Sequence, residues 1–117
     1  MRKVLVVDDE ALIRMAVIDA LEDAGFTVIE AGTADDALDL INDELIHFLF
    51  TDIQMPGKHS GVDLAHQVAA RFPQAGIVVA SGRIVSEDIS LPPTAKFVAN
   101  PYDLELIVKH FQTLADC

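Results

Sequence analysis

Five short apolar segments recur along the chain, separated by stretches with helical periodicity. These segments are 4–7, 27–29, 48–50, 77–80 and 97–99. Each is rich in Val, Ile or Phe and is closed by polar or turn-forming residues. Uninterrupted apolar character, rather than strict alternation with polar residues, is typical of strands covered on both faces, as in a parallel sheet. The pattern therefore predicts five buried, parallel strands.

The stretches between these segments carry apolar residues at the three- and four-residue spacing of amphipathic helices. We expect helices over 11–24, 34–44, 62–72 and 102–115, and a shorter one within 82–91. Gly25 and Pro73 are expected to end the first and third helices, and Thr33 to cap the second. This alternation predicts an α/β fold, a doubly wound five-stranded parallel sheet. The length suits one domain over 1–117, with no output domain attached.

The charge balance restricts the partners that the chain can bind. It has 8 Lys and Arg against 19 Asp and Glu, a net charge of −11, which argues against non-specific binding to nucleic acid. The single cysteine, Cys117, allows no internal disulfide. No apolar segment is long enough for a signal peptide or a membrane span. We therefore expect a cytoplasmic protein that contacts neither nucleic acid nor membrane.

Three acidic residues stand where predicted strands end. Asp8 and Asp9 follow the first strand, and Asp52 follows the third. The carboxyl ends of parallel strands meet at one edge of the sheet, so these carboxylates are expected to converge, with Ser81 and Asn100 beside them. Carboxylates at short range repel one another unless they take up protons or a cation. Oxygen ligands alone favour Mg²⁺, with Mn²⁺ as the alternative, and disfavour zinc.

Four segments at these strand ends resemble the response-regulator receiver domains of two-component signal transduction. They are residues 4–10 (VLVVDDE), 52–57 (DIQMPG), 79–82 (VASG) and 100–102 (NPY). The resemblance covers the whole chain in order and implies the flavodoxin-like receiver fold of five βα units. A stand-alone receiver similar to the chemotaxis regulators is the closest description. Such proteins switch their binding to a downstream partner when they are phosphorylated.

The resemblance also implies roles for individual residues. Asp52 matches the aspartate that accepts a phosphoryl group from a histidine kinase or a histidine phosphotransfer protein. Asp9, Asp52 and the backbone carbonyl of Gln54 match the Mg²⁺ ligands, while Asp8 matches the acid that binds the ion through water. Ser81 matches the hydroxyl that hydrogen-bonds the phosphoryl group, and Phe97 the switch aromatic. The protein is then a phosphoacceptor and not an enzyme, apart from catalysing its own phosphorylation and dephosphorylation.

Two features depart from the family pattern. Asn100 stands where the family has a lysine, so one cation of the phosphoryl pocket is missing. Lys96 lies too far along its strand to replace it, and we hypothesise that Arg83 partly does. The loop 57–61 is one residue longer than usual, and Pro92-Pro93 shortens the fourth helix, which puts the family's usual output face in doubt.

Two alternatives remain open at this stage. One is a degenerate receiver that serves as a docking module without phosphorylation, which Asn100 alone supports. The other is a Mg²⁺-dependent phosphohydrolase of the haloacid-dehalogenase type. Those enzymes place a second acid two residues after the nucleophilic aspartate, and Gln54 at that position counts against this reading.

Overall fold

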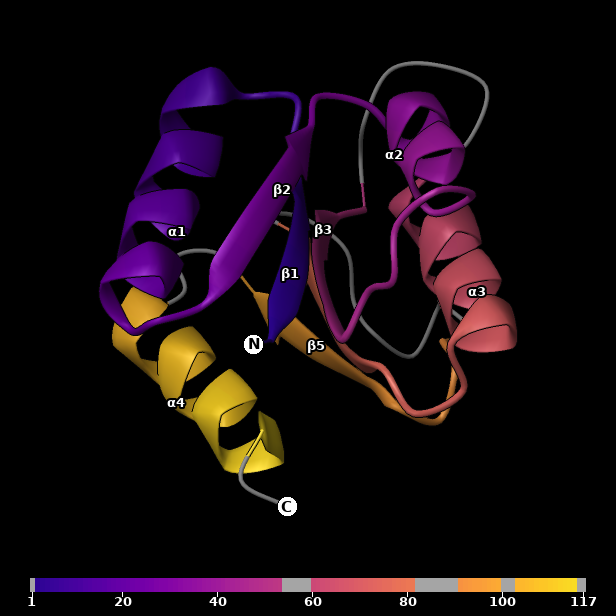
Figure 1. The fold of residues 1–117 in the computed structure, drawn as a ribbon. Coiled ribbons are helices and arrows are strands. Elements are labelled where there is room, and N and C mark those ends of the chain that lie inside the picture. The colour runs from indigo at the N-terminus through magenta and orange to yellow at the C-terminus, as the bar shows by residue number, and fades with distance from the viewer. Residues whose placement is uncertain (1, 54–59, 82–90, 100–102, 116–117) are drawn as a thin grey trace.

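A parallel sheet of five strands runs through the centre of the computed structural model (Figure 1). The structure describes residues 2–53, 60–81, 91–99 and 103–115. The strands are β1 (Lys3–Val7), β2 (Thr27–Ala31), β3 (Phe48–Asp52), β4 (Gly76–Ser81) and β5 (Ala95–Ala99). Their order across the sheet is β2-β1-β3-β4-β5. All four neighbouring pairs are parallel, as the apolar segments predict.

Two pairs of helices cover the two faces of the sheet. The described helices are α1 (Ala11–Asp23), α2 (Ala34–Leu40), α3 (Gly61–Arg71) and α4 (Leu104–Ala115). Figure 1 shows α1 and α4 on one side of the sheet and α2 and α3 on the other. The doubly wound α/β fold is therefore confirmed. The short helix expected within 82–91 falls almost entirely outside the described residues.

Alternate residues of β1 enter two separate hydrophobic cores. Val4 and Val6 pack in the cluster that faces α1 and α4, whereas Leu5 and Val7 pack in the cluster that faces α2 and α3. All four side chains are fully buried. A central strand must be apolar at every position because both of its faces are covered, and this explains the uninterrupted apolar segment in the sequence.

The expectation that all five strands are buried on both faces was wrong for the two edge strands, β2 and β5. In β5, Lys96 and Ala99 are exposed, and the other residues of this strand are only half-buried. In β2, Glu30 is exposed and only Ala31 is buried. The physical reason is strand order, because β2 and β5 lie at the two edges of the sheet and each has only one neighbouring strand. Edge strands commonly carry a lysine, which discourages pairing with another chain.

The helix ends agree with the sequence in most places. Gly25 ends the turn after α1 with a φ of +96°, and Thr33 Oγ1 accepts the N–H of Asp36 at 3.1 Å at the start of α2. The helix expected over 34–44 ends earlier, at Leu40, since the chain turns there to bring Ile46 into the core. In the described part of the chain, no helix combines the length and apolar character needed to cross a membrane.

Candidate functional site

Three carboxylates meet at the carboxyl edge of the sheet. Strands β1 and β3 are neighbours in register, with Val7 opposite Thr51, so the residues that follow each of them share one edge. Carboxylate oxygens of Asp8, Asp9 and Asp52 lie within 4.8 Å of one another. The structure therefore brings together the acids that the sequence placed at strand ends. Asp52 is the last residue of β3 rather than the first residue after it.

Asp8 is the buried member of this cluster. Its side chain is only 3% exposed, and its Oδ1 accepts the backbone N–H of Glu10 at 2.9 Å. Burial, helped by the charges of Asp52 and Asp9, raises the pKa of Asp8 to about 6, against the opposing effect of that hydrogen bond. Ionising Asp8 is costly because it is buried beside other carboxylates. A cation bound among these carboxylates would offset that cost and favour the ionised form. Asp9 is exposed and Asp52 half-buried, so the cluster opens to solvent.

Arg14 fixes the backbone at the start of this site. Its Nη1 donates to the carbonyl oxygen of Asp8 at 2.6 Å, and its Nε pairs with Glu30 Oε1 at 2.8 Å. The Asp8 N–H donates in turn to the carbonyl oxygen of Ala31 at 3.3 Å. One cationic side chain from α1 therefore ties the end of β1 to the end of β2. The sequence did not predict this role for Arg14, because no local pattern indicates that a side chain contacts a backbone carbonyl elsewhere in the chain.

A glycine anchors the chain that returns beside Asp52. Gly61 donates its N–H to the carbonyl oxygen of Ile53 at 3.0 Å. A Cβ at Gly61 would lie 2.7 Å from the carbonyl carbon of Asp52 and 2.9 Å from Ile53 Cα, so only glycine fits without a backbone shift. Ser60 and Asp63 form a capping box that starts α3 at this point. Sequence reasoning missed Gly61, although the Ser-Gly-x-Asp pattern predicts a helix start here.

Ser81 lies at the same edge of the sheet. Asp52 is opposite Ala80 in the β3–β4 register, and Ser81 follows as the last residue of β4, 1% exposed. The site thus holds an acidic cluster, an accessible carboxylate and a nearby buried hydroxyl. Three oxygen-only side chains fit a hard divalent cation such as Mg²⁺ and include none of the His or Cys ligands that are typical of zinc sites.

The family model of the response regulator receiver domain matches residues 4–109. The chain belongs to this family. As a receiver domain it is a phosphoacceptor signalling module of two-component systems. Receiver domains bind Mg²⁺ at their acidic pocket, which the cluster of three aspartates fits.

Similar proteins support this assignment over the whole chain. The response regulator receiver protein CpdR of Brucella abortus is 26% identical over 117 residues, which cover 97% of each chain. The transcriptional regulatory protein PdtaR of Mycobacterium tuberculosis is 34% identical over 71 residues, but that match covers 60% of this chain and 34% of PdtaR. The chain therefore spans nearly all of one relative and about a third of another.

Solved receiver structures share the fold. A response regulator receiver protein from Sinorhizobium medicae superimposes with a TM-score of 0.90 at 22% identity, covering 99% of this chain and 95% of its own. The response regulator TrrA from Thermotoga maritima, solved in complex with Mg(2+)-BeF, gives a TM-score of 0.85 at 23% identity, covering 97% of this chain and 99% of its own.

The remaining candidate residues of the receiver domain are placed as follows. Phe97 is half-buried in β5, opposite Val79, and packs against the core that faces α2 and α3. Lys96 is opposite Val78, three positions before the Ser81–Ala99 pair, or about 10 Å along the strand. This agrees with the expectation that Lys96 does not replace the missing lysine. Three further candidates, Gln54, Arg83 and Asn100, lie outside the described residues.

Proposed function

We propose that Asp52 is the phosphoacceptor and that it receives its phosphoryl group from a histidine kinase or a histidine phosphotransfer protein. The observation that carries the proposal is the convergence of Asp8, Asp9 and Asp52 within 4.8 Å at the carboxyl edge of the sheet. Of these three, Asp52 belongs to a central strand and is half-buried, so its carboxylate is both held in place and accessible.

In the proposed transfer, a carboxylate oxygen of Asp52 attacks phosphorus. A new oxygen–phosphorus bond forms while the bond from phosphorus to the donor imidazole nitrogen breaks, and its electron pair stays on that nitrogen. The product is an acyl phosphate on Asp52. Ser81 then donates a hydrogen bond from its hydroxyl to a phosphoryl oxygen, and Phe97 changes its packing as the switch aromatic.

Asp8, Asp9, Asp52 and the backbone carbonyl of Gln54 would hold Mg²⁺. The bound ion supplies charge neutralisation between the nucleophile and the phosphoryl oxygens. Asp8 contributes a charge that is costly to leave unpaired, since burial already raises its pKa to about 6. Arg14 holds the backbone carbonyl of Asp8, and this contact keeps the end of β1 in place.

We propose further that residues 1–117 form a single receiver domain in the cytoplasm. It works as a switch for a downstream protein and not as an enzyme that turns over free substrates, and it makes no direct contact with nucleic acid or membrane. The alternative is a receiver that docks to its partner without phosphorylation, and Asn100 at the usual lysine position favours it.

Intact-mass spectrometry tests the proposed function. The protein is incubated with Mg²⁺ and acetyl phosphate, and its mass is compared with that of the Asp52→Asn variant. We expect a labile gain of one phosphoryl group that the variant lacks. No gain, even with a cognate kinase, would favour the docking module. Repeated turnover of unrelated phosphoesters would favour the phosphohydrolase.

A further inference from the structure

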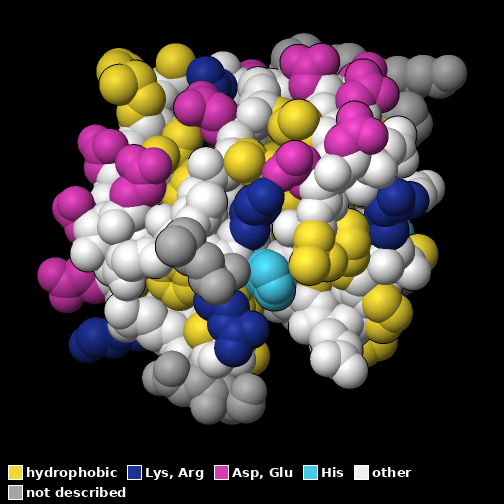
Figure 2. All heavy atoms as spheres, viewed as in Figure 1, with side chains coloured by type: hydrophobic (Ala, Val, Ile, Leu, Met, Phe, Trp, Pro, Cys, Tyr) yellow, Lys and Arg dark blue, Asp and Glu magenta, His cyan; other side chains and the backbone are white. Residues whose placement is uncertain are grey.

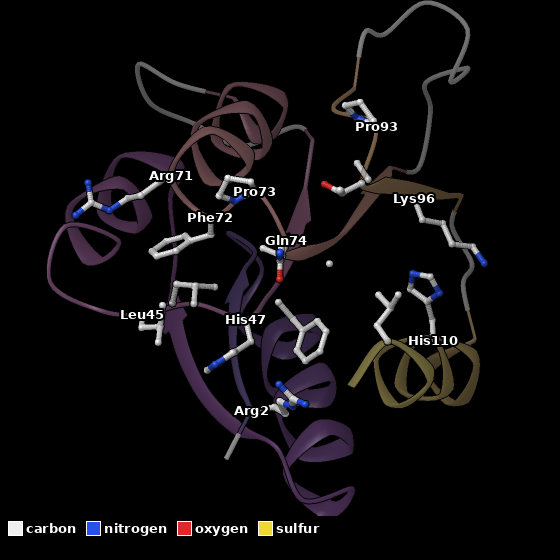
Figure 3. A pocket seen from close by; sticks show the side chains of 17 residues that line it. Arg2, Leu45, His47, Arg71, Phe72, Pro73, Gln74, Pro93, Lys96 and His110 are labelled. Atoms are coloured by element: carbon white, nitrogen blue, oxygen red, sulfur yellow. The ribbon is translucent and has the colours of Figure 1, made fainter. Parts of the chain in front are cut away.

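A broad groove lies at the edge of the sheet opposite the three aspartates. It encloses about 910 Å³ around the amino ends of β3, β4 and β5, between the carboxyl-terminal ends of α3 and α4 (Figure 3). The strands are parallel, so this edge is separated from Asp52 by the length of a strand. A ligand in the groove would leave the phosphoacceptor edge open.

The groove offers apolar surface within reach of solvent. Phe48, Phe72 and Leu114 contribute to its walls, and Leu45, also in the lining, is 62% exposed. Gly76 keeps the space open, because a Cβ there would lie 2.5 Å from Leu114 Cδ1 and 3.0 Å from Phe48 Cδ1. A groove of this kind can bury apolar side chains of a ligand.

The charged residues of the groove are all basic. Arg2, Arg71 and Lys96 line it together with His47 and His110, and none of the seventeen lining residues is acidic, although 19 of the 117 residues in the chain are acids. In Figure 2 acidic side chains gather at the top and left of the view, while a histidine and several basic side chains lie near its centre. The groove is therefore lined by basic and not by acidic side chains, although the protein as a whole is strongly negative.

Both histidines of the groove lie near basic side chains. Burial, and then the charges of Arg2 and Lys3, lower the pKa of His47. Burial, and then the charge of Lys96, lower the pKa of His110. In the described part of the chain, neither ring gains a carboxylate partner that would favour its protonated form. His47 Nδ1 accepts the N–H of Lys3 at 3.1 Å, so the neutral ring carries its hydrogen on Nε2.

The cations are placed by separate elements and are not neutralised by ion pairs within the described residues. Arg71, at the end of α3, donates to the carbonyl oxygen of Asn42 at 3.2 Å. Arg2 donates to the carbonyl oxygen of Ala115 at 2.8 Å at the end of α4. Lys96 stands exposed on β5, and Figure 3 shows it across the groove from Arg71. Cations on opposite walls suit several anionic groups spaced along a chain better than one compact anion.

We propose that this groove, termed here the basic groove, binds an acidic segment of a partner protein that carries apolar side chains between its carboxylates. The apolar surface buries the side chains, and Arg2, Arg71 and Lys96 attract the carboxylates from three sides. Binding in the basic groove does not require phosphorylation of Asp52, because the groove and Asp52 lie at opposite edges of the sheet.

Fluorescence anisotropy with the full chain tests the proposal. The probe is a short labelled peptide that alternates glutamate with leucine, at near-physiological salt. We expect binding that weakens about tenfold in Lys96→Glu and less than about twofold in Lys109→Glu. Lys109 is the matched control, since it is exposed on α4 and lies outside the groove lining. Circular dichroism melts check that both variants are folded.

A second set of measurements distinguishes an acidic peptide from other occupants of the basic groove. Amide shifts in a ¹H–¹⁵N spectrum are expected at Gly76, Ala95 and His110 on addition of the peptide. The proposal is overturned if a glutamine-for-glutamate peptide binds equally well, or if both lysine variants weaken binding to the same extent. It is also overturned if ATP shifts these amides while the peptide does not, or if sedimentation shows self-association that Lys96→Glu abolishes, which would make a second copy the occupant.

Discussion

The α-carbon of Gly61 lies against the backbone of Asp52, with no room for a side chain between them. A Cβ at Gly61 would come within 2.9 Å of Ile53 Cα and closer still to the Asp52 carbonyl. These neighbours are backbone atoms of the last residue of a central strand and of the residue after it, which cannot move aside as the end of a flexible side chain can. The first residue of α3 therefore packs directly against the backbone of the proposed phosphoacceptor, and a side chain at this position would displace that backbone.

We expect Gly61→Ala to displace the end of β3 and slow phosphorylation by acetyl phosphate. The free energy of unfolding, measured in urea, should fall by about 1–3 kcal/mol. Gly25→Ala is the control: its φ of +96° makes alanine strained by about 1–2 kcal/mol, but nothing lies within 4 Å of the added Cβ. Equal loss of phosphorylation in both variants would show that general destabilisation, and not the contact with Asp52, controls the rate.

The raised pKa of Asp8 makes the stability of the metal-free protein depend on pH. Its pKa is about 6 in the folded chain against an ordinary 3.8, so the folded state holds this proton more tightly than the unfolded state. Stability should therefore fall as pH rises from about 4 to about 7, by up to about 3 kcal/mol from this group. Urea unfolding in EDTA measures the slope, and Asp8→Asn should flatten it. Mg²⁺ should restore stability at neutral pH in the original protein more than in the variant, and an identical slope in both proteins would contradict the assignment.

Exposed apolar side chains beside the acidic cluster predict where the phosphodonor docks. Leu12 is 84% and Met15 is 56% exposed, both near the start of α1, which follows Asp9 closely in the chain. We expect Leu12→Ser to slow phosphotransfer from a phosphohistidine protein about tenfold and to leave the reaction with acetyl phosphate unchanged. Leu45→Ser, which also removes an exposed leucine but at the opposite edge, should affect neither reaction. Slower reaction with acetyl phosphate in Leu12→Ser would point to a disturbed site instead of a lost contact.

Asn100 predicts a phosphoryl pocket with one cation fewer than is usual in receiver domains. Asn100→Lys should speed phosphorylation by acetyl phosphate several-fold, because the added charge attracts the developing phosphoryl anion. If Arg83 partly replaces the lysine, Arg83→Ala should slow phosphorylation in the original protein and have little effect once Asn100→Lys is present. Phosphorylation and dephosphorylation rates follow from the same mass measurements. An Arg83→Ala variant with unchanged rates would rule out the replacement.

The local sequence pattern predicted the architecture because a central parallel strand must be apolar at every position. Val4 to Val7 had to be apolar at each position to fill two cores at once, and this requirement is visible without coordinates. The placement of Asp8, Asp9 and Asp52 followed for a related reason: parallel strands end at one edge, so acids that follow buried segments must meet there.

Strand order and close packing were decided only by the tertiary structure. No local pattern shows that β5 is an edge strand, that Gly61 lies against Asp52, or that Arg71 and Lys96 lie on opposite sides of one groove. Each depends on contacts between residues far apart in the chain. The amino-acid sequence determined which faces are buried and where the carboxylates end their strands, since both are local consequences of hydrophobicity and backbone period. The neighbours of each strand, and hence the basic groove, followed from how the buried faces pack together in three dimensions.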